Sequence, residues 1–350
     1  MSTLDLSPGA RLTSLDVFRG LTIASMVMVN NQTRGAYPEL QHASWHGWTF
    51  TDMVFPFFLW IVGVAMTLST ARRMDRGESR SGLLMHTLRR AAIIFAIGLF
   101  MNGFPSYDLS TLRIPGVLQR IAVCYLIAGV IFLYSSTRGR VLWTVALLAG
   151  YWLMMAPGGY EKGTNFGDRV DQMFLLGHMY TPTRDPEGLV STLPAIATCL
   201  FGILTGDFLR TSLGAAEKAA WMFLSGNVLI FLGKAFDYFQ PINKNLWTVT
   251  YTVLMAGLAL VVFASCYWLV DAKGIKRYWT QPFAIFGMNA IAVYVFHGFL
   301  GRAARKIVPA GSLDPLFSTQ NAALVYSLAH VGICFGFAYL LYRKRWLLKF

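Results

Sequence analysis

The stretch RIPGVLQRIAVCYLIAGVIFLY, residues 113–134, decides the fold class of this chain. From Ile121 to Tyr134 it carries no charged residue. With the residues before it, the run approaches the ~20 mostly apolar residues that a helix needs to cross a ~30 Å hydrocarbon core. Similar runs recur from Leu21 to the last residues, so lipid is expected to be the main solvent.

Composition supports this interpretation. The 350 residues are 55% hydrophobic and 13% charged, with a mean hydropathy of +0.49, so charge is too scarce to solvate a soluble surface. The sequence therefore predicts an all-α, polytopic membrane bundle of about ten transmembrane helices, with residues 1–350 forming a single domain. Ten windows are expected to span the membrane: 17–35, 53–71, 87–103, 115–135, 140–156, 189–209, 219–238, 246–270, 282–300 and 321–342.

The net charge of +13 could indicate a nucleic-acid partner, but the basic residues lie between the apolar segments, as topology signals do. Most of them fall on the side of the two termini. The positive-inside rule then predicts that both termini are cytoplasmic, including residues 1–14, and that 158–188 is a long periplasmic loop. This loop is either a lid or a plain connector.

Polar groups at membrane depth cost ~2.5 to 3.5 kcal/mol each, so they are expected to face a protein interior or a water-filled cavity. In SLDVFRG, residues 14–20, Asp16 and Arg19 are three positions apart on one helix face and can pair. This pair either starts a helix or helps to bind an anionic ligand. Asn30 and Asn31, near the other end of the same window, are too polar for a lipid face.

Two histidines open the stretch HASWHGWTFTDMVFPFF, residues 42–58. His42 and His46 are four apart, but Gly47 favours an irregular segment over a helix. No carboxylate or cysteine at suitable spacing completes a zinc site, so no metal is expected. His46 is interpreted as an interfacial anchor, whereas Asp52, near the start of the next helix, can cap that helix and orient an imidazole.

Other polar residues lie inside or between apolar windows. Arg120 needs an acceptor at its depth, which is either an anionic ligand or an internal partner such as Asp237. Lys244 follows Asn243 in the outer segment PINKNLW, and Asn289 and His297 lie near one stripe of GMNAIAVYVFH. Hydrogen bonds between helices, worth ~0.6 kcal/mol on average, are the alternative to a binding role.

Taken together, the chain resembles the heparan-α-glucosaminide N-acetyltransferases of lysosomes and their bacterial relatives within the transmembrane acyltransferase group. The resemblance covers nearly the whole chain in the order of the family. It rests on SLDVFRG, MVMVN (26–30), HASWHGWTFTDMVFPFF, RIPGVLQR (113–120), GLVST (188–192), NKNLW (243–247), GMNAIAVYVFH (287–297) and YRKRW (342–346).

The resemblance implies an enzyme that moves an acetyl group from cytosolic acetyl-CoA to the amine of a terminal glucosamine on the far side of the membrane. It assigns the active histidine to His42 and an upstream asparagine to Asn30, with Asn31 as a rival because the interval to His42 is one residue longer. The chain is expected to lack the family's large N-terminal lumenal domain. A member in the bacterial inner membrane, acting on a periplasmic amino sugar or short glycan, is therefore expected.

Acyl transfer requires a base or a nucleophile and donors for the oxyanion. His42 is expected to act as the base or the acetyl-accepting nucleophile, with Asn30 and Asp52 completing the catalytic set. The residues expected to bind acetyl-CoA are Arg19, Gln119, Arg120, Lys244, Asn289 and His297. The alternatives are a secondary transporter of sugars or organic anions and a scaffold without turnover; the sequence leaves homodimerisation open.

Overall fold

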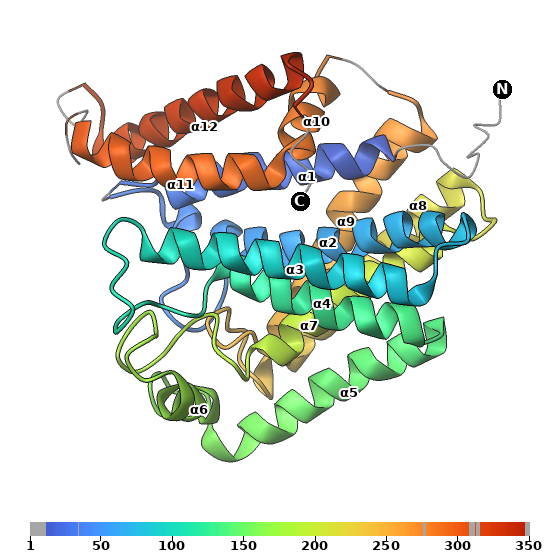
Figure 1. The fold of residues 1–350 in the computed structure, drawn as a ribbon, viewed down its shortest axis with the longest axis horizontal. Coiled ribbons are helices and arrows are strands. Elements are labelled where there is room, and N and C mark those ends of the chain that lie inside the picture. Colours follow the sequence, from blue (N-terminus) through green and yellow to red (C-terminus); the bar gives the residue numbers. More distant parts are fainter. Residues whose placement is uncertain (1–11, 34, 276–277, 308–311, 313–315, 347–350) are drawn as a thin grey trace.

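A computed structural model describes residues 12–346 except 34, 276–277, 308–311 and 313–315 (Figure 1). This part of the chain contains helices and no strands, as the apolar windows predict. Residues 1–11 of the predicted cytoplasmic stretch lie outside it. The helices are α1 (Thr13–Asn30), α2 (Phe50–Asp75), α3 (Arg80–Gly103), α4 (Val117–Tyr134), α5 (Thr137–Met155), α6 (Phe166–Leu175), α7 (Thr192–Leu209), α8 (Ala215–Ala235), α9 (Val249–Tyr267), α10 (Thr280–Met288), α11 (Ala290–Ile307) and α12 (Thr319–Arg343).

Within the described residues, eight helices are long and apolar enough to cross a membrane, namely α2, α3, α4, α5, α7, α8, α9 and α12. The pair α10 and α11 passes the same test as one span, although the chain bends by 84° between them (Figure 1). Each of the ten predicted windows coincides with one of these elements or with α1. Helix α1 is not among the helices apolar enough to cross a membrane, because Asp16 and Arg19 lower its mean hydropathy.

Close helix crossings depend on glycine. A Cβ atom at Gly202 of α7 would lie 2.0 Å from the carbonyl oxygen of Trp60 in α2, and one at Gly63 would lie 2.0 Å from that of Cys199. Between α1 and α10, a Cβ at Gly20 would lie 1.7 Å from the carbonyl oxygen of Phe283. Small residues let membrane helices approach closely. Close backbone packing stabilises helix pairs in lipid, where the hydrophobic effect does not drive their association.

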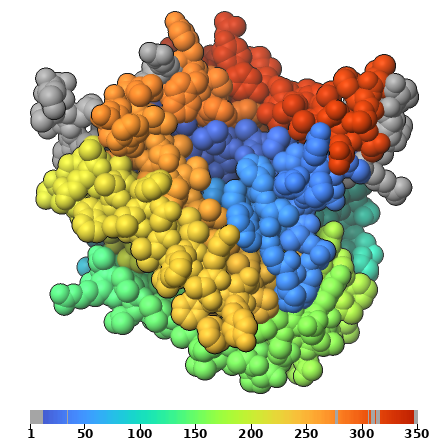
Figure 2. All heavy atoms as spheres, turned by 180° about the vertical axis from the view of Figure 1, so that it is seen from behind, coloured from blue at the N-terminus to red at the C-terminus, as the bar shows by residue number. Residues whose placement is uncertain are grey.

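The helices form a bundle in which α1 and α2 connect two groups of helices. Figure 1 shows α12 and α10 above α1, α11 level with α1, and α3, α4, α7 and α5 below α2. From behind, α1 and α2 reach the surface between the yellow α8 and the orange to red C-terminal helices (Figure 2). Helices α1 and α2 both line the cavity described below.

The segment 158–188, predicted to be a long loop, contains the ten-residue helix α6. The Asn165 side chain caps it by accepting a hydrogen bond from the Asp168 amide at 2.9 Å. The helix buries Asp168 and Asp171 and exposes Met173 and Phe174. The sequence did not predict this helix because ten residues are too short for a membrane-spanning window. The apolar side of α6 faces outward, as in helices that lie at a membrane surface.

Candidate functional site

One cavity of about 1120 Å³ connects the groups of polar residues at the two ends of the bundle. It is lined along α2 from Thr51 to Arg73 and along α1 from Asp16 to Asn30. At 1.5 Å per residue, the α2 wall alone extends about 33 Å. This matches the ~30 Å hydrocarbon thickness of a bilayer, so the cavity runs nearly the full depth of the bundle.

At one end, which we call the outer end, His42 lies against the start of α2. Its Nδ1 is 2.7 Å from Oδ1 of Asp52, whose side chain is 1% exposed while that of His42 is 54% exposed. The other carboxylate oxygen accepts hydrogen bonds from the Ala43 and Thr49 amides at 3.0 and 3.1 Å. Asp52 thus caps α2. In the tautomer that carries its proton on Nδ1, His42 donates to Asp52, and Nε2 is then able to accept a proton or attack a carbonyl.

Lys244, expected to bind acetyl-CoA, lies against this histidine in the same cavity. Its Nζ is 2.8 Å from Nδ1 and 3.3 Å from Nε2 of His42, and 3.4 Å from Oδ1 of Asp52. The loop that carries it is docked on the His42 segment, because the Gly47 amide donates to Ile242 O at 2.7 Å. Burial lowers the pKa of the Lys244 ammonium, and the negative charge of Asp52 partly opposes this effect.

The two rival asparagines separate clearly. Asn30 is exposed and lines the same cavity as His42. Asn31 is buried, donates to Val27 O at 2.8 Å, and has its Nδ2 3.0 Å from Nδ1 of His297. Asn30 is therefore the asparagine placed to meet a ligand in the cavity, and Asn31 and His297 link α1 to α11.

Four predicted acetyl-CoA residues, Gln119, Arg120, Asn289 and His297, are buried and lie outside the cavity wall as the described residues define it. Arg120 donates to Gly188 O at 3.0 Å and to Oγ of Ser191, and its guanidinium lies 5.2 Å from the Trp247 ring centroid.

The suggested Arg120–Asp237 ion pair is wrong. Asp237 instead accepts a hydrogen bond from the Ile242 amide at 2.6 Å. The acceptors for Arg120 come from the start of the GLVST segment, which no spacing in the sequence connects to α4.

At the opposite, inner end, the cavity wall carries mainly cations. Arg19 pairs with Asp16 at 3.3 Å, as the i, i+3 spacing predicts, and also donates to Gly287 O at 3.3 Å. The further basic residues that line this end are Arg72, Arg73, His86 and Arg90. These residues were not predicted as site residues, because basic residues at helix ends usually indicate membrane topology. Only the structure shows which of them face the cavity.

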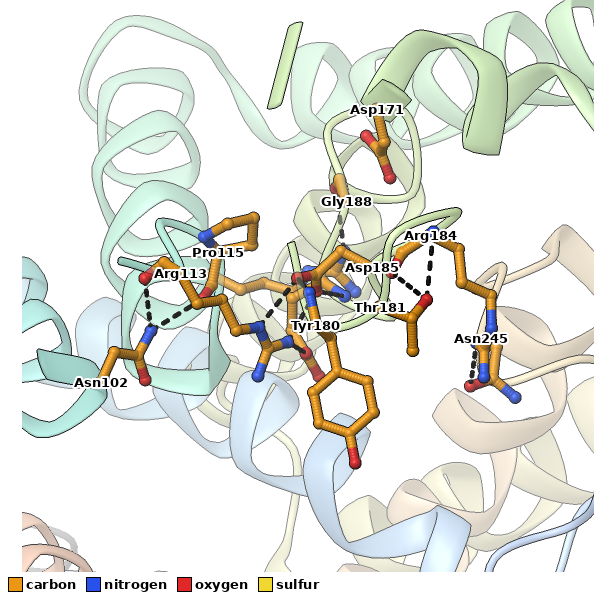
Figure 3. Close-up of polar contacts among 12 residues, drawn as sticks. Asn102, Arg113, Pro115, Asp171, Tyr180, Thr181, Arg184, Asp185, Gly188 and Asn245 are labelled. Carbon is orange, nitrogen blue, oxygen red and sulfur yellow. Dashed lines mark hydrogen bonds and ion pairs between the residues drawn. The ribbon is translucent and has the colours of Figure 1, made fainter. Parts of the chain in front are cut away.

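The outer end is walled by the segment between α6 and α7 (Figure 3). Arg184 donates to Oδ1 of Asn245 at 3.0 Å and lies 5.1 Å from the Trp45 ring centroid. Arg113 holds the segment through ion pairs with Asp185 and Glu187. Residues Tyr180, Arg184, Pro186 and Glu187 line the cavity, so the predicted periplasmic loop forms part of the site wall.

His46 has no place in this wall. Its ring packs edge-on against Trp45 at 6.1 Å between centroids, and its Nδ1 lies 3.4 Å from Nδ2 of Asn243. Its contacts thus support the junction of two outer loops. Within the described residues, no three His, Cys, Asp or Glu side chains are grouped as a metal site would require.

Asp171 contacts the segment between α6 and α7 that forms the outer wall of the cavity. Its Oδ1 accepts a hydrogen bond from the Leu189 amide at 2.8 Å, yet burial raises its pKa to about 6. Because the folded protein binds this proton more tightly than the unfolded chain does, stability falls as the pH rises from about 4 to 6. Replacing Asp171 by asparagine is expected to remove this fall and to stabilise the protein at pH 7.5 by up to about 3 kcal/mol.

Thermal unfolding of the detergent-solubilised protein at pH 4.5 and 7.5 measures this effect. The Asp108→Asn variant is the control, because Asp108 is exposed and hydrogen bonds from Ser110 lower its pKa. An Asp171→Asn variant with the pH dependence of the wild type would contradict the assignment.

Known proteins resemble this chain over most of its length. The family model for "Heparan-alpha-glucosaminide N-acetyltransferase, catalytic" matches residues 11–237. The mouse heparan-alpha-glucosaminide N-acetyltransferase is 30% identical over 97% of this chain and 60% of its own length. The human protein of the same name is 32% identical over 82% of this chain, which spans 52% of the human protein. From its match to the family model, the chain belongs to the family of heparan-alpha-glucosaminide N-acetyltransferase catalytic domains.

Proposed function

We propose that the protein is a transmembrane N-acetyltransferase that moves an acetyl group from cytosolic acetyl-CoA to the amine of an amino sugar on the periplasmic side of a bacterial inner membrane. The observation that carries the proposal is the deep cavity with His42 and Asp52 at one end and a group of cations at the other. The names of the mouse and human relatives support the reaction class.

The two ends of the cavity suit two different substrates. Arginines pair well with phosphate oxygens, so the inner end offers a site for the nucleotide of acetyl-CoA. Between the ends the wall is mainly apolar, with Ile23, Met26, Phe58 and Ile61, and can accommodate the pantetheine arm. The thioester would then lie near His42, while the nucleotide stays on the positively charged side that the charge distribution predicts to be cytoplasmic.

His42 can act by either of two routes. As a base, Nε2 takes a proton from the acceptor amine while the amine nitrogen attacks the thioester carbon. The C–S bond then breaks, and CoA leaves as a thiolate that takes up a proton. As a nucleophile, Nε2 itself attacks the thioester carbon and CoA leaves. The amine then attacks the acetyl-imidazole, loses a proton, and restores the free ring.

Neighbouring groups serve both routes. Asp52 keeps the proton on Nδ1 and orients the ring. The amide of Asn30 and the ammonium of Lys244 are the donors assigned to the developing oxyanion, since both line the same cavity as His42 and Lys244 contacts its ring. The proposal thus assigns Lys244 to the acyl group instead of the CoA phosphates.

The inner end provides a matched test. Arg90 lines the cavity, whereas the adjacent Arg89 is exposed and lies outside the cavity wall as described. Replacing Arg90 by glutamine is expected to raise the KM for acetyl-CoA about tenfold, because a charge-assisted hydrogen bond to phosphate contributes ~1.5 to 3 kcal/mol. Arg89→Gln should leave this KM unchanged. Equal effects of the two variants would argue against a nucleotide site at the inner end.

The decisive assay incubates the purified protein with acetyl-CoA and amino sugars and follows the release of free thiol. Release that depends on the amino sugar supports the enzyme. A deep cavity also suits a secondary transporter. Absence of thiol release with every amine, together with substrate-dependent uptake into vesicles, would favour that function.

A further inference from the structure

Two carboxylates share one arginine in the outer wall of the cavity. Arg113 donates through Nε and Nη2 to Asp185, at 2.8 and 2.6 Å, and through Nη2 also to Glu187 (Figure 3). Although burial opposes it, these contacts raise the pKa of Arg113, which therefore remains a cation. One positive charge thus faces two negative charges.

The two carboxylates have different surroundings. The Asp185 side chain is 0% exposed and also accepts hydrogen bonds from the Tyr180 and Glu187 amides at 2.8 and 2.9 Å. Its contacts fold the segment onto itself. The Glu187 side chain is 10% exposed and lines the cavity, so the excess negative charge of the group is presented to the cavity by Glu187.

The other carboxylates near the cavity are already matched by cations. Asp52 contacts His42 and Lys244, and Asp16 pairs with Arg19 at the inner end. An anion at the outer end would meet the charge of Glu187, whereas a cation there would complete the neutralisation of the Arg113 group. Arg184 is a further cation of this wall, but its guanidinium donates to Asn245 and lies over the Trp45 ring, and no ion pair joins it to Glu187 among the described residues. The Glu187 carboxylate is therefore the group of this wall that favours a cationic ligand.

We propose that Glu187 is the specificity-determining residue for the acceptor: its carboxylate binds the protonated amine of an amino sugar at the outer end of the cavity, beside His42. This inference rests on the proposed acetyltransferase function. The ring of Tyr180, which lines the same wall and lies 4.9 Å from the Arg113 guanidinium, offers an apolar surface for the sugar. Glu187 thus selects a primary amine and holds it near Nε2 of His42. In the general-base route, Nε2 takes one proton from the ammonium, the freed nitrogen attacks the thioester carbon as the C–S bond breaks, and the second proton passes to the departing CoA thiolate.

The test compares Glu187→Gln with Glu161→Gln in the full-length protein. Glu161 belongs to the same outer segment, but it is exposed and lies outside the described cavity wall. Glu187→Gln is expected to raise the KM for glucosamine about 10- to 100-fold, the usual range for a charge-assisted hydrogen bond, and to leave the KM for acetyl-CoA within twofold. Glu187→Asp should give a smaller rise, and Glu161→Gln none.

Binding measurements separate this inference from the proposed function. By calorimetry, the wild type should bind glucosamine more tightly than N-acetylglucosamine, which has no cationic amine, and Glu187→Gln should lose this preference. Binding that depends on Glu187 without any thiol release would uphold the site and refute the enzyme. An unchanged preference in Glu187→Gln, or an equal rise of both KM values, would overturn the inference; if this variant does not fold, an unchanged preference in Glu187→Asp would do so.

Discussion

Replacing His42 by alanine is expected to reduce the rate of amino-sugar-dependent CoA release by roughly 10²- to 10⁴-fold, the usual contribution of a general base. The reduction should be larger if His42 is the nucleophile, because loss of a nucleophile removes the covalent route altogether. It should appear in kcat, since the proposed nucleotide site lies at the other end of the cavity. The measurement is steady-state thiol release from purified protein.

His46→Ala is the matched control. His46 lies in the same segment, and its described contacts are with Trp45 and Asn243. Its loss should therefore leave kcat within a few-fold of the wild type. CoA release that survives His42→Ala would refute the catalytic assignment. Incubation with labelled acetyl-CoA without acceptor then separates the routes: label retained on the wild-type protein indicates an acetyl-imidazole, and a requirement for both substrates indicates direct attack.

Replacing Gly202 by valine is expected to destabilise the protein by more than about 3 kcal/mol. The new Cβ would lie 2.0 Å from the carbonyl oxygen of Trp60 and 3.1 Å from the Val64 amide nitrogen, and backbone atoms cannot move aside as a flexible side chain can. Overpacking alone costs typically ~1 to 3 kcal/mol, and separating two helices adds to it. In thermal unfolding this corresponds to a fall of roughly 6 °C or more.

Gly150→Val is the control for the same chemical change. Gly150 also lies within a predicted span, on α5, but a Cβ there would have no atom within 4 Å. Its unfolding temperature should stay near that of the wild type. If both variants unfold alike, the close crossing of α2 and α7 does not limit stability.

Local features of the sequence predicted the helices well. Apolar length sets where a helix can cross a bilayer, so all ten windows coincide with helices, including the bent pair α10 and α11. The contact between His42 and Asp52 was also predictable, because they are ten residues apart with Asp52 in the first turn of α2. The orientation of the termini and the chemical roles of these residues remain predictions.

Contacts between distant segments could not be predicted in the same way. Lys244 reaches His42 across 202 positions, and Arg113 reaches Asp185 across 72, so no periodicity reports either contact. The direction in which a polar residue faces was equally hidden: His297 turns to Asn31, while Arg90 turns into the cavity. The helix pattern fixes which residues share a face but not which neighbour that face meets.

The apolar middle of the cavity has an electrical consequence. A membrane that stores energy as an ion gradient is discharged by any continuous thread of water through it. Between the cations at one end and the His42 group at the other, the wall includes Ile23, Met26, Phe58 and Ile61, whose side chains offer water no hydrogen bonds. Apolar surface of this kind disfavours a continuous file of water and ions, whereas it suits an uncharged acyl chain.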